Sequence, residues 1–424
     1  MNIILIAIPF FFLLIGLELW ADWYRKTQYY RLNDAISSLA LGIVSRATDI
    51  AKKFVPFTIY ALLVDHIALV SLPDTPWVWL LAFVLYDFCY YWTHRMSHEI
   101  NILWAAHVVH HSSEEYNLTT ALRQTSSGFF TWIFYIPLAL LGIPWEMFVA
   151  VGALNLVYQF WVHTRHVPKL GWYENIFVTP SNHRVHHAQN QVYIDRNYGG
   201  VFITWDRLFG TFQEELEDEP CIYGIRKPLK SWNPVWANLH FYWQLIKDAW
   251  RTDSWKAKFV IWFKPTGWRP EDVAEKYPMT PADLSKFKKF DIQITGWQKV
   301  YALLQHIVVV IATLTVMLQL ASFDQAQIVA GVLFIIYASY SLSLTLSNHR
   351  WFKAFELVKH GSFLGLMQML SVPVWLSQIS LGAVVISLLV LVMAVKQGID
   401  AKVNQLAEES ELEKDEQETK LAAE

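Results

Sequence analysis

Three short clusters of histidines carry the chemistry that this sequence suggests. His94 and His98 stand four residues apart, and two later clusters repeat the spacing i, i+3, i+4. Because residues three or four apart lie on one face of a helix, each cluster presents its rings in a common direction. The later clusters are His107, His110 and His111, and then His183, His186 and His187.

Imidazole rings in such numbers predict metal binding. The ring is neutral over most of the physiological pH range and is a ligand for iron, zinc, copper and nickel. Eight ring nitrogens exceed what one ion coordinates, so the clusters predict a site for two metal ions. Cys89 and Cys221 are far apart in the chain, which does not support a cysteine-based zinc site. Spacing alone does not choose iron over zinc. We interpret the isolated histidines as structural: His66, His240, His306, His349 and His360.

The composition places these clusters in a membrane protein. Of 424 residues, 54% are hydrophobic, with 21 Trp and 26 Phe, which is more apolar surface than a soluble core hides. The net charge of -3 gives no basic excess, so nucleic acid is not an expected partner. Runs near the roughly 20 apolar residues that cross a bilayer predict spans at 3–20, 54–70, 76–93, 127–143, 145–162, 299–321, 327–346, 361–377 and 379–396. Charges interrupt 36–53, which either extends the second span or lies in the interface.

We therefore expect an all-α, polytopic membrane protein with a histidine-rich di-metal domain at its cytoplasmic face. Basic residues follow the first span at Arg25, Lys26 and Arg31 and the seventh at Arg350 and Lys353, which predicts cytoplasmic connections there. Threading alternately from these connections puts all three clusters on the same side, of either a bacterial inner membrane or an endoplasmic reticulum. The first span reads as an uncleaved anchor. The expected parts are N-terminal membrane helices at 1–75, the histidine-bearing membrane domain at 76–215, a cytoplasmic interfacial segment at 216–298, C-terminal membrane helices at 299–397, and a charged tail at 398–424 that is a solvated helix or disordered.

The ordered pattern H-x3-H, H-x2-HH, H-x2-HH resembles the fatty acid hydroxylase/sterol desaturase superfamily of membrane non-haem di-iron enzymes. Glu99, ALRQ at 121–124, QFWVHT at 159–164 and the run 182–212 are similar to the members that cleave alkylglycerol ethers. The resemblance implies two iron ions, O2 as co-substrate and a membrane lipid substrate, cleaved to fatty aldehyde and glycerol. It implies tetrahydrobiopterin as electron donor, and a separate donor protein is the alternative because no haem domain is fused to the chain.

Other functions remain open at this stage. The ligand motifs do not distinguish ether cleavage from hydroxylation or desaturation of a sterol or fatty acid. A non-catalytic metal-binding or transport protein is the more distant alternative, although a transporter would hold its ligands near the middle of the membrane.

Side chains beside the clusters are further candidates, and we predict that Glu99 and Asp87 are catalytic residues. Glu99 could bridge or bind a metal, or orient a ligand ring, or simply lie on the helix surface. Asp87 lies inside an apolar span, where a carboxylate is costly, and could orient a ligand ring or join two helices. His163 is a possible ninth metal ligand, because some relatives place one there, whereas His166 is not required by the pattern. We assign Trp205, Asp206, Arg207 and Phe209 mainly to packing.

Overall fold

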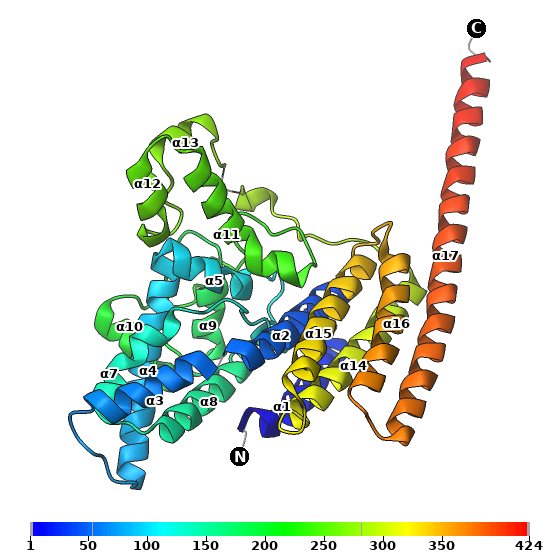
Figure 1. Ribbon diagram of the computed structural model, residues 1–424. Coiled ribbons are helices and arrows are strands. Elements are labelled where there is room, and N and C mark those ends of the chain that lie inside the picture. Colours follow the sequence, from blue (N-terminus) through cyan, green and yellow to red (C-terminus); the bar gives the residue numbers. More distant parts are fainter. Residues whose placement is uncertain (1–2, 53, 281, 422–424) are drawn as a thin grey trace. The chain divides into compact units, whose positions relative to one another are not determined.

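The computed structural model describes residues 3–52, 54–280 and 282–421, and these residues form helices joined by loops (Figure 1). They contain no strand, only three isolated β-bridges. The all-α prediction is therefore confirmed. The chain divides into two compact units, Met1–Phe290 and Asp291–Glu424. The finer division into five parts stays a prediction.

The first unit contains the helices that hold the histidines. Its α-helices are α1 (Ile3–Arg25), α2 (Leu32–Lys52), α3 (Phe54–Ile67), α4 (Pro76–Glu99), α5 (Asn101–His111), α6 (Leu118–Ala121), α7 (Ile136–Leu140), α8 (Trp145–Trp161), α9 (Pro180–His187), α10 (Thr204–Phe209), α11 (Pro234–Arg251), α12 (Trp255–Val260) and α13 (Glu271–Lys276). Four 3-10 turns accompany them: η1 (Thr131–Tyr135), η2 (Gly171–Asn175), η3 (Ile261–Phe263) and η4 (Leu284–Lys286). Helix α4 packs against α5 and α8, and α11 packs against α5.

A one-residue break separates the first two histidine clusters. Ile100 is extended, with φ of -123° and ψ of 127°, so α4 ends there and α5 begins at Asn101. The Asn101 side chain donates to the carbonyls of Ile261 and Trp268 at 2.9 and 3.2 Å, which fixes the start of α5 against a later loop. The break folds α5 back onto α4, and the two clusters face each other.

The second unit is a group of long helices: α14 (Gly296–Leu318), α15 (Gln325–Leu346), α16 (Phe352–Met369) and α17 (Val374–Leu421). Helix α15 packs against α14 and α16, and α17 packs against the same two helices. Glu356 is fully buried among them, where it pairs with Lys359 and accepts a hydrogen bond from the Tyr301 hydroxyl at 2.5 Å. Helix α17 continues as one helix through the charged tail to Leu421 (Figure 1).

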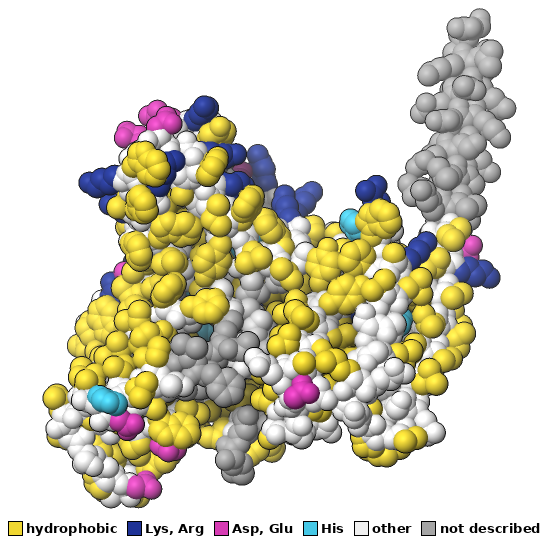
Figure 2. Space-filling view, viewed as in Figure 1, with side chains coloured by type: hydrophobic (Ala, Val, Ile, Leu, Met, Phe, Trp, Pro, Cys, Tyr) yellow, Lys and Arg dark blue, Asp and Glu magenta, His cyan; other side chains and the backbone are white. Residues whose placement is uncertain are grey.

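The chain is an integral membrane protein, but the nine predicted spans need correction. By length and composition, four of the described helices can cross a bilayer: Ile6–Arg25, Gly296–Leu318, Gln325–Leu346 and Val374–Asp400. Exposed apolar side chains are widespread on the face shown in Figure 2, as lipid contact requires.

The predicted spans failed where turns interrupt apolar runs. The helical part of the run 127–143 is too short to be a span, because η1 and α7 together cover only Thr131–Leu140. The run 361–377 is also broken, since α16 ends at Met369 and α17 begins after Pro373. Helices α3 and α8 have only 14 and 17 residues. In the predicted span 54–70, the side chains of 54–57 lie outside the described part of the chain.

Candidate metal centre

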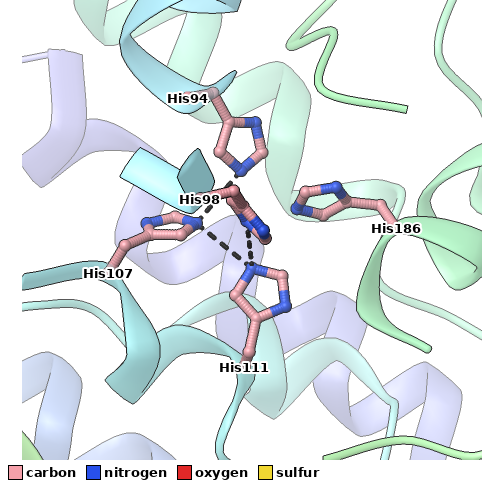
Figure 3. Close-up of side chains that lie close together, drawn as sticks. All are labelled: His94, His98, His107, His111 and His186. Atoms are coloured by element: carbon pink, nitrogen blue, oxygen red, sulfur yellow. Dashed lines mark hydrogen bonds between the residues drawn. The ribbon is translucent and has the colours of Figure 1, made fainter. Parts of the chain in front are cut away.

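The structure brings all nine predicted metal ligands together in two compact groups. Within each group, one ligand atom per histidine lies within 4.8 Å of the others. The five-histidine group consists of His94, His98, His107, His111 and His186, and the four-histidine group of His110, His163, His183 and His187. Figure 3 shows rings of the five-histidine group converging from α4, α5 and α9.

Each i, i+3, i+4 cluster is divided between the two groups. From α5, His107 and His111 join the five-histidine group, whereas His110 joins the four-histidine group. From α9, His186 joins the first and the other two histidines join the second. The division follows from helix geometry, because the 100° step per residue turns position i+3 to one side of i and i+4 to the other.

Helix α9 has a strong local start for so short a helix. Thr179 caps its first turn, and the Asn182 side chain accepts a hydrogen bond from the Thr179 backbone amide. Pro180 occupies the first helical position, where its fixed φ fits and its missing N–H costs nothing. Arg184 then joins the helix to Glu215 at 2.7 Å. These contacts fix the first half of α9, where the ligand cluster begins.

In the five-histidine group the ring nitrogens approach closely. The Nε2 atom of His107 lies 3.0 Å from that of His94 and 3.1 Å from that of His111. The His98 and His111 Nε2 atoms are also 3.1 Å apart (Figure 3). His186 Nε2 is buried in the same group and has no hydrogen-bond partner.

The four-histidine group gives the clearest sign of a cation. His110 Nδ1 lies 3.0 Å from the Arg123 carbonyl, and His163 Nδ1 lies 2.7 Å from the Gln159 carbonyl. A carbonyl only accepts, so both Nδ1 atoms carry protons and both neutral rings keep a lone pair on Nε2. These two Nε2 atoms are 3.4 Å apart. Two lone pairs repel each other, and a metal ion bound by both satisfies them.

At neutral pH, neither ring takes up a second proton that would let one Nε2 atom donate a hydrogen bond to the other. Burial lowers the pKa of His110 to about 4. Burial, followed by repulsion from neighbouring rings, lowers the pKa of His107, His111, His183 and His187 well below the usual range. These five rings are therefore neutral near pH 7, which is the form that binds metals. An all-nitrogen donor set of this kind fits iron as well as zinc.

The two predicted carboxylates lie outside both groups. Glu99 is 37% exposed and accepts a hydrogen bond from Arg95 Nε at 2.8 Å. Asp87 is fully buried, and its four hydrogen bonds come from Asn155 Nδ2, the amides of Val201 and Phe202, and Trp205 Nε1. Asp87 thus joins α4 to α8 and to the loop after α9. The catalytic role assigned to each carboxylate stays a prediction.

Sequence reasoning missed the groups that hold the rings. The carbonyls of Arg123, Gln159, Arg196 and Tyr198 accept hydrogen bonds from His110, His163, His186 and His94. Nothing in a sequence marks a backbone carbonyl in advance. Asp206, assigned to packing, instead accepts hydrogen bonds from two backbone amides and the Thr211 hydroxyl. The sequence did contain one signal for this role, because Asp206 follows Gly199 and Gly200 closely and glycines let a backbone approach a carboxylate.

Comparison with known proteins places this site in a family. The fatty acid hydroxylase family model matches residues 79–211, which include all nine histidines. The chain is 38% identical to alkylglycerol monooxygenase of Homo sapiens over 349 residues, covering 81% of this chain and 77% of the human protein. The chain belongs to the alkylglycerol monooxygenase family.

Other relatives agree with this assignment. Alkylglycerol monooxygenase of Xenopus tropicalis is 40% identical over 71% of this chain and 68% of its own length. Ornithine lipid hydroxylase of Rhizobium tropici is 33% identical over 34% of this chain and 44% of its own length. No solved structure matches the chain. The protein is therefore a membrane lipid monooxygenase, an oxidoreductase, and not the non-catalytic alternative.

Proposed function

We propose that each histidine group holds one iron ion and that the enzyme uses O2 to cleave alkylglycerol ether lipids. The observation that carries the metal assignment is the facing pair of lone pairs on His110 and His163, 3.4 Å apart. The names of the relatives support the substrate. When bound, the two ions would supply the change of oxidation state that O2 activation needs, which zinc does not offer.

The chain's own residues prepare the site before any substrate arrives. Backbone carbonyls hold the Nδ1–H of four rings, so each of these rings presents an unprotonated Nε2 without further rearrangement. Eight of the nine rings are buried, and His107 is partly buried. Burial keeps water away from the ligand atoms and lowers the pKa of rings such as His110 and His183, which keeps those rings neutral.

The proposed reaction balances with one donor of two electrons. One oxygen atom of O2 enters the C–H bond beside the ether oxygen and gives a hemiacetal. Its C–O bond to the glycerol unit then breaks, which releases a fatty aldehyde and glycerol. The second oxygen atom leaves as water after taking two electrons and two protons. Tetrahydrobiopterin is our first candidate for the donor, and a separate electron-transfer protein is the second.

We further propose that the histidine groups face the cytoplasm and that α11 lies in the adjoining membrane interface. Its exposed apolar residues recur at steps of three and four along one face: Trp236, Leu239, Trp243, Ile246 and Trp250. Lys247 and Arg251 follow on the same helix, a composition typical of interfacial helices. The other side of α11 packs through Leu245 against Ala105 of α5. The ligand helix would thus be held close to the lipid that supplies the substrate.

Metal analysis and turnover together test the proposal. Detergent-purified protein should contain about two iron ions per chain and release aldehyde from 1-O-alkylglycerol in the presence of reduced pterin and O2. His186→Ala should abolish turnover and lower metal content, whereas His66→Ala, at an exposed isolated histidine, should change neither. Zinc-only protein without lipid-dependent O2 uptake would refute the iron assignment. Hydroxylation or desaturation of a sterol or acyl lipid without aldehyde would refute the ether-lipid substrate and favour those reactions.

A further inference from the structure

A single loop holds part of the five-histidine group in place. The segment between α9 and α10 carries the Tyr198 carbonyl, which accepts a hydrogen bond from His94 Nδ1 at 2.8 Å. The same segment carries the Arg196 carbonyl, which accepts from His186 Nδ1 at 2.9 Å. The backbone here is irregular, and Asn197 has a positive φ of 57°. A few backbone hydrogen bonds hold it, such as that from the Asn197 amide to the Thr211 carbonyl at 3.1 Å, and side chains supply further contacts.

Asp206 provides the nearest of these contacts. Its Oδ2 atom accepts from the Gly199 amide at 2.8 Å, and its Oδ1 atom accepts from the Tyr198 amide at 2.7 Å. The Gly199 N–H and the Tyr198 C=O belong to the same planar peptide group. One peptide therefore connects the Asp206 carboxylate to the His94 ring, with its N–H toward the carboxylate and its C=O toward the imidazole.

The glycines allow this close approach. A Cβ atom on Gly199 would lie 2.6 Å from the Phe202 carbonyl oxygen and 3.0 Å from Asp206 Oδ2. A Cβ atom on Gly200 would lie 2.8 Å from Asp87 Oδ1. Side chains at either position would displace the carboxylates from the backbone.

Asp87 anchors the other end of the same loop. Its two oxygens accept from the Val201 and Phe202 amides at 2.8 and 3.0 Å. Asp87 lies on α4, seven residues before His94 and therefore nearly on the same face of the helix. The loop is thus bonded to the helix that carries the ring it orients.

We propose that Asp206 is a positioning residue that acts on His94 through the peptide between Tyr198 and Gly199, and so sets the metal affinity of the five-histidine group. This inference rests on the proposed binding of metal by that group. A carboxylate at one end of a hydrogen-bonded chain polarises the peptide and strengthens the bond that its carbonyl accepts. A stronger bond to Nδ1–H fixes the tautomer of His94 and makes its Nε2 a better donor to a metal.

The effect should be confined to one of the two groups. In the four-histidine group, His110 and His163 donate to the carbonyls of Arg123 and Gln159, neither of which belongs to this loop. Loss of Asp206 should therefore weaken one metal site and spare the other.

The test is a titration of metal-free, full-length protein with Co²⁺, followed by its visible absorbance. In Asp206→Asn an amide donor replaces a carboxylate oxygen opposite the backbone amides, while the shape is kept. We expect one of two binding steps to weaken about 10- to 100-fold, the range for loss of such an outer partner, and the other to stay unchanged. The control is Asp248→Asn on α11, which removes a buried carboxylate that pairs with Arg269. It should leave both binding steps unchanged.

Double variants identify the affected group. Adding His94→Ala to Asp206→Asn should cost little more than His94→Ala alone, because both act on one site. Adding His163→Ala should instead weaken both steps. Unchanged binding in Asp206→Asn, or equal weakening of both steps, would overturn the inference while leaving the metal centre intact. Failure of the wild type to bind two ions would overturn the proposed function together with this inference.

A milder variant covers the case in which Asp206→Asn does not fold. Thr211→Val removes the hydroxyl that donates to Asp206 Oδ1 at 2.7 Å and that also lies 3.0 Å from the Tyr91 hydroxyl. The same binding step should weaken by a smaller factor, and the other should not move. If Asp206→Asn does not fold, and folded Thr211→Val binds Co²⁺ as the wild type does in both steps, the result would count against the inference.

Discussion

His163 offers the sharpest test of the metal centre, because sequence alone left it undecided between a ninth ligand and a helix-end histidine. In the structure it is buried, and its Nε2 lies 3.1 Å from that of His183. We expect His163→Ala to reduce the four-histidine group to three rings. His166→Ala is the matched control, since it removes a histidine three residues later that belongs to neither group.

The magnitude follows from the number of ligands. A structural metal site with four ligands contributes about 10–16 kcal/mol in small zinc-binding peptides, so one ligand of four is worth roughly 3 kcal/mol. That figure corresponds to at least about a hundredfold in affinity. The fold itself loses the hydrogen bond from His163 Nδ1 to the Gln159 carbonyl, which contributes only about 1 kcal/mol. Metal loss should therefore appear in protein that is still folded.

The assay combines elemental analysis with circular dichroism on the same sample. Wild type and His166→Ala should carry about two ions per chain. His163→Ala should carry about one after dialysis against a weak chelator, with its helix signal unchanged. Two retained ions in folded His163→Ala would refute the ninth-ligand assignment and the lone-pair reasoning that supports it.

Three further predictions concern stability and placement. Removing metal with a strong chelator should lower the thermal midpoint, and re-adding iron should restore it, because an ion that binds only the folded state stabilises that state; an unchanged midpoint would contradict this. Arg123→Met should lower the free energy of unfolding by about 3 kcal/mol, because it removes the stronger of the two positive neighbours of buried Asp34, the other being Arg31. Lys169→Met, in the exposed pair with Glu214, should cost below about 1 kcal/mol in the same denaturation experiment. A spin label on Ile246→Cys in a lipid nanodisc should be reached by O2 and shielded from a water-soluble nickel chelate, whereas a label on Glu271→Cys in α13 should show the reverse; equal access of the chelate to both would remove α11 from the interface.

The histidine spacing predicted more of the site than any other feature. Position i+4 on a helix returns almost to the face of position i, so His94 with His98 and His107 with His111 had to act together. The sequence could not show that His110 turns toward a different partner from His107, because that depends on where α8 and α9 approach α5. The sequence shows which residues share a face of a helix, but not which neighbouring elements that face contacts.

Glu99 shows how adjacency in sequence misleads. It follows His98 directly, but one residue along a helix turns the side chain by about 100°. It therefore points away from the ring and meets Arg95, four residues earlier on its own face. Asp206 was misjudged for a different reason, since its partners are backbone amides of a loop whose path only the tertiary structure fixes.

The sequence predicted too many spans, because each span was counted from the length of an apolar run, and this length does not show where the helix ends. Apolar residues fill much of 127–143, yet only Thr131–Leu140 is helical, and the chain then turns at Gly142, which has a φ of 73°. A Cβ atom there would lie 2.0 Å from the Val70 carbonyl oxygen, so the residue must be glycine for the turn to close. The well-predicted spans in the second unit contain no such turn between their ends.

The division of each i, i+3, i+4 cluster between the two groups makes α5 and α9 rigid spacers. Each helix holds ligands of both groups on one backbone, so the separation of the two metal positions is set by a helical turn and not by a flexible loop. Inserting one residue between His107 and His110 would rotate the following ligands by about 100°. It would thereby remove a ring from each group at once. The two positions can be tuned separately by loops and carboxylates, but they cannot be moved apart without breaking a helix.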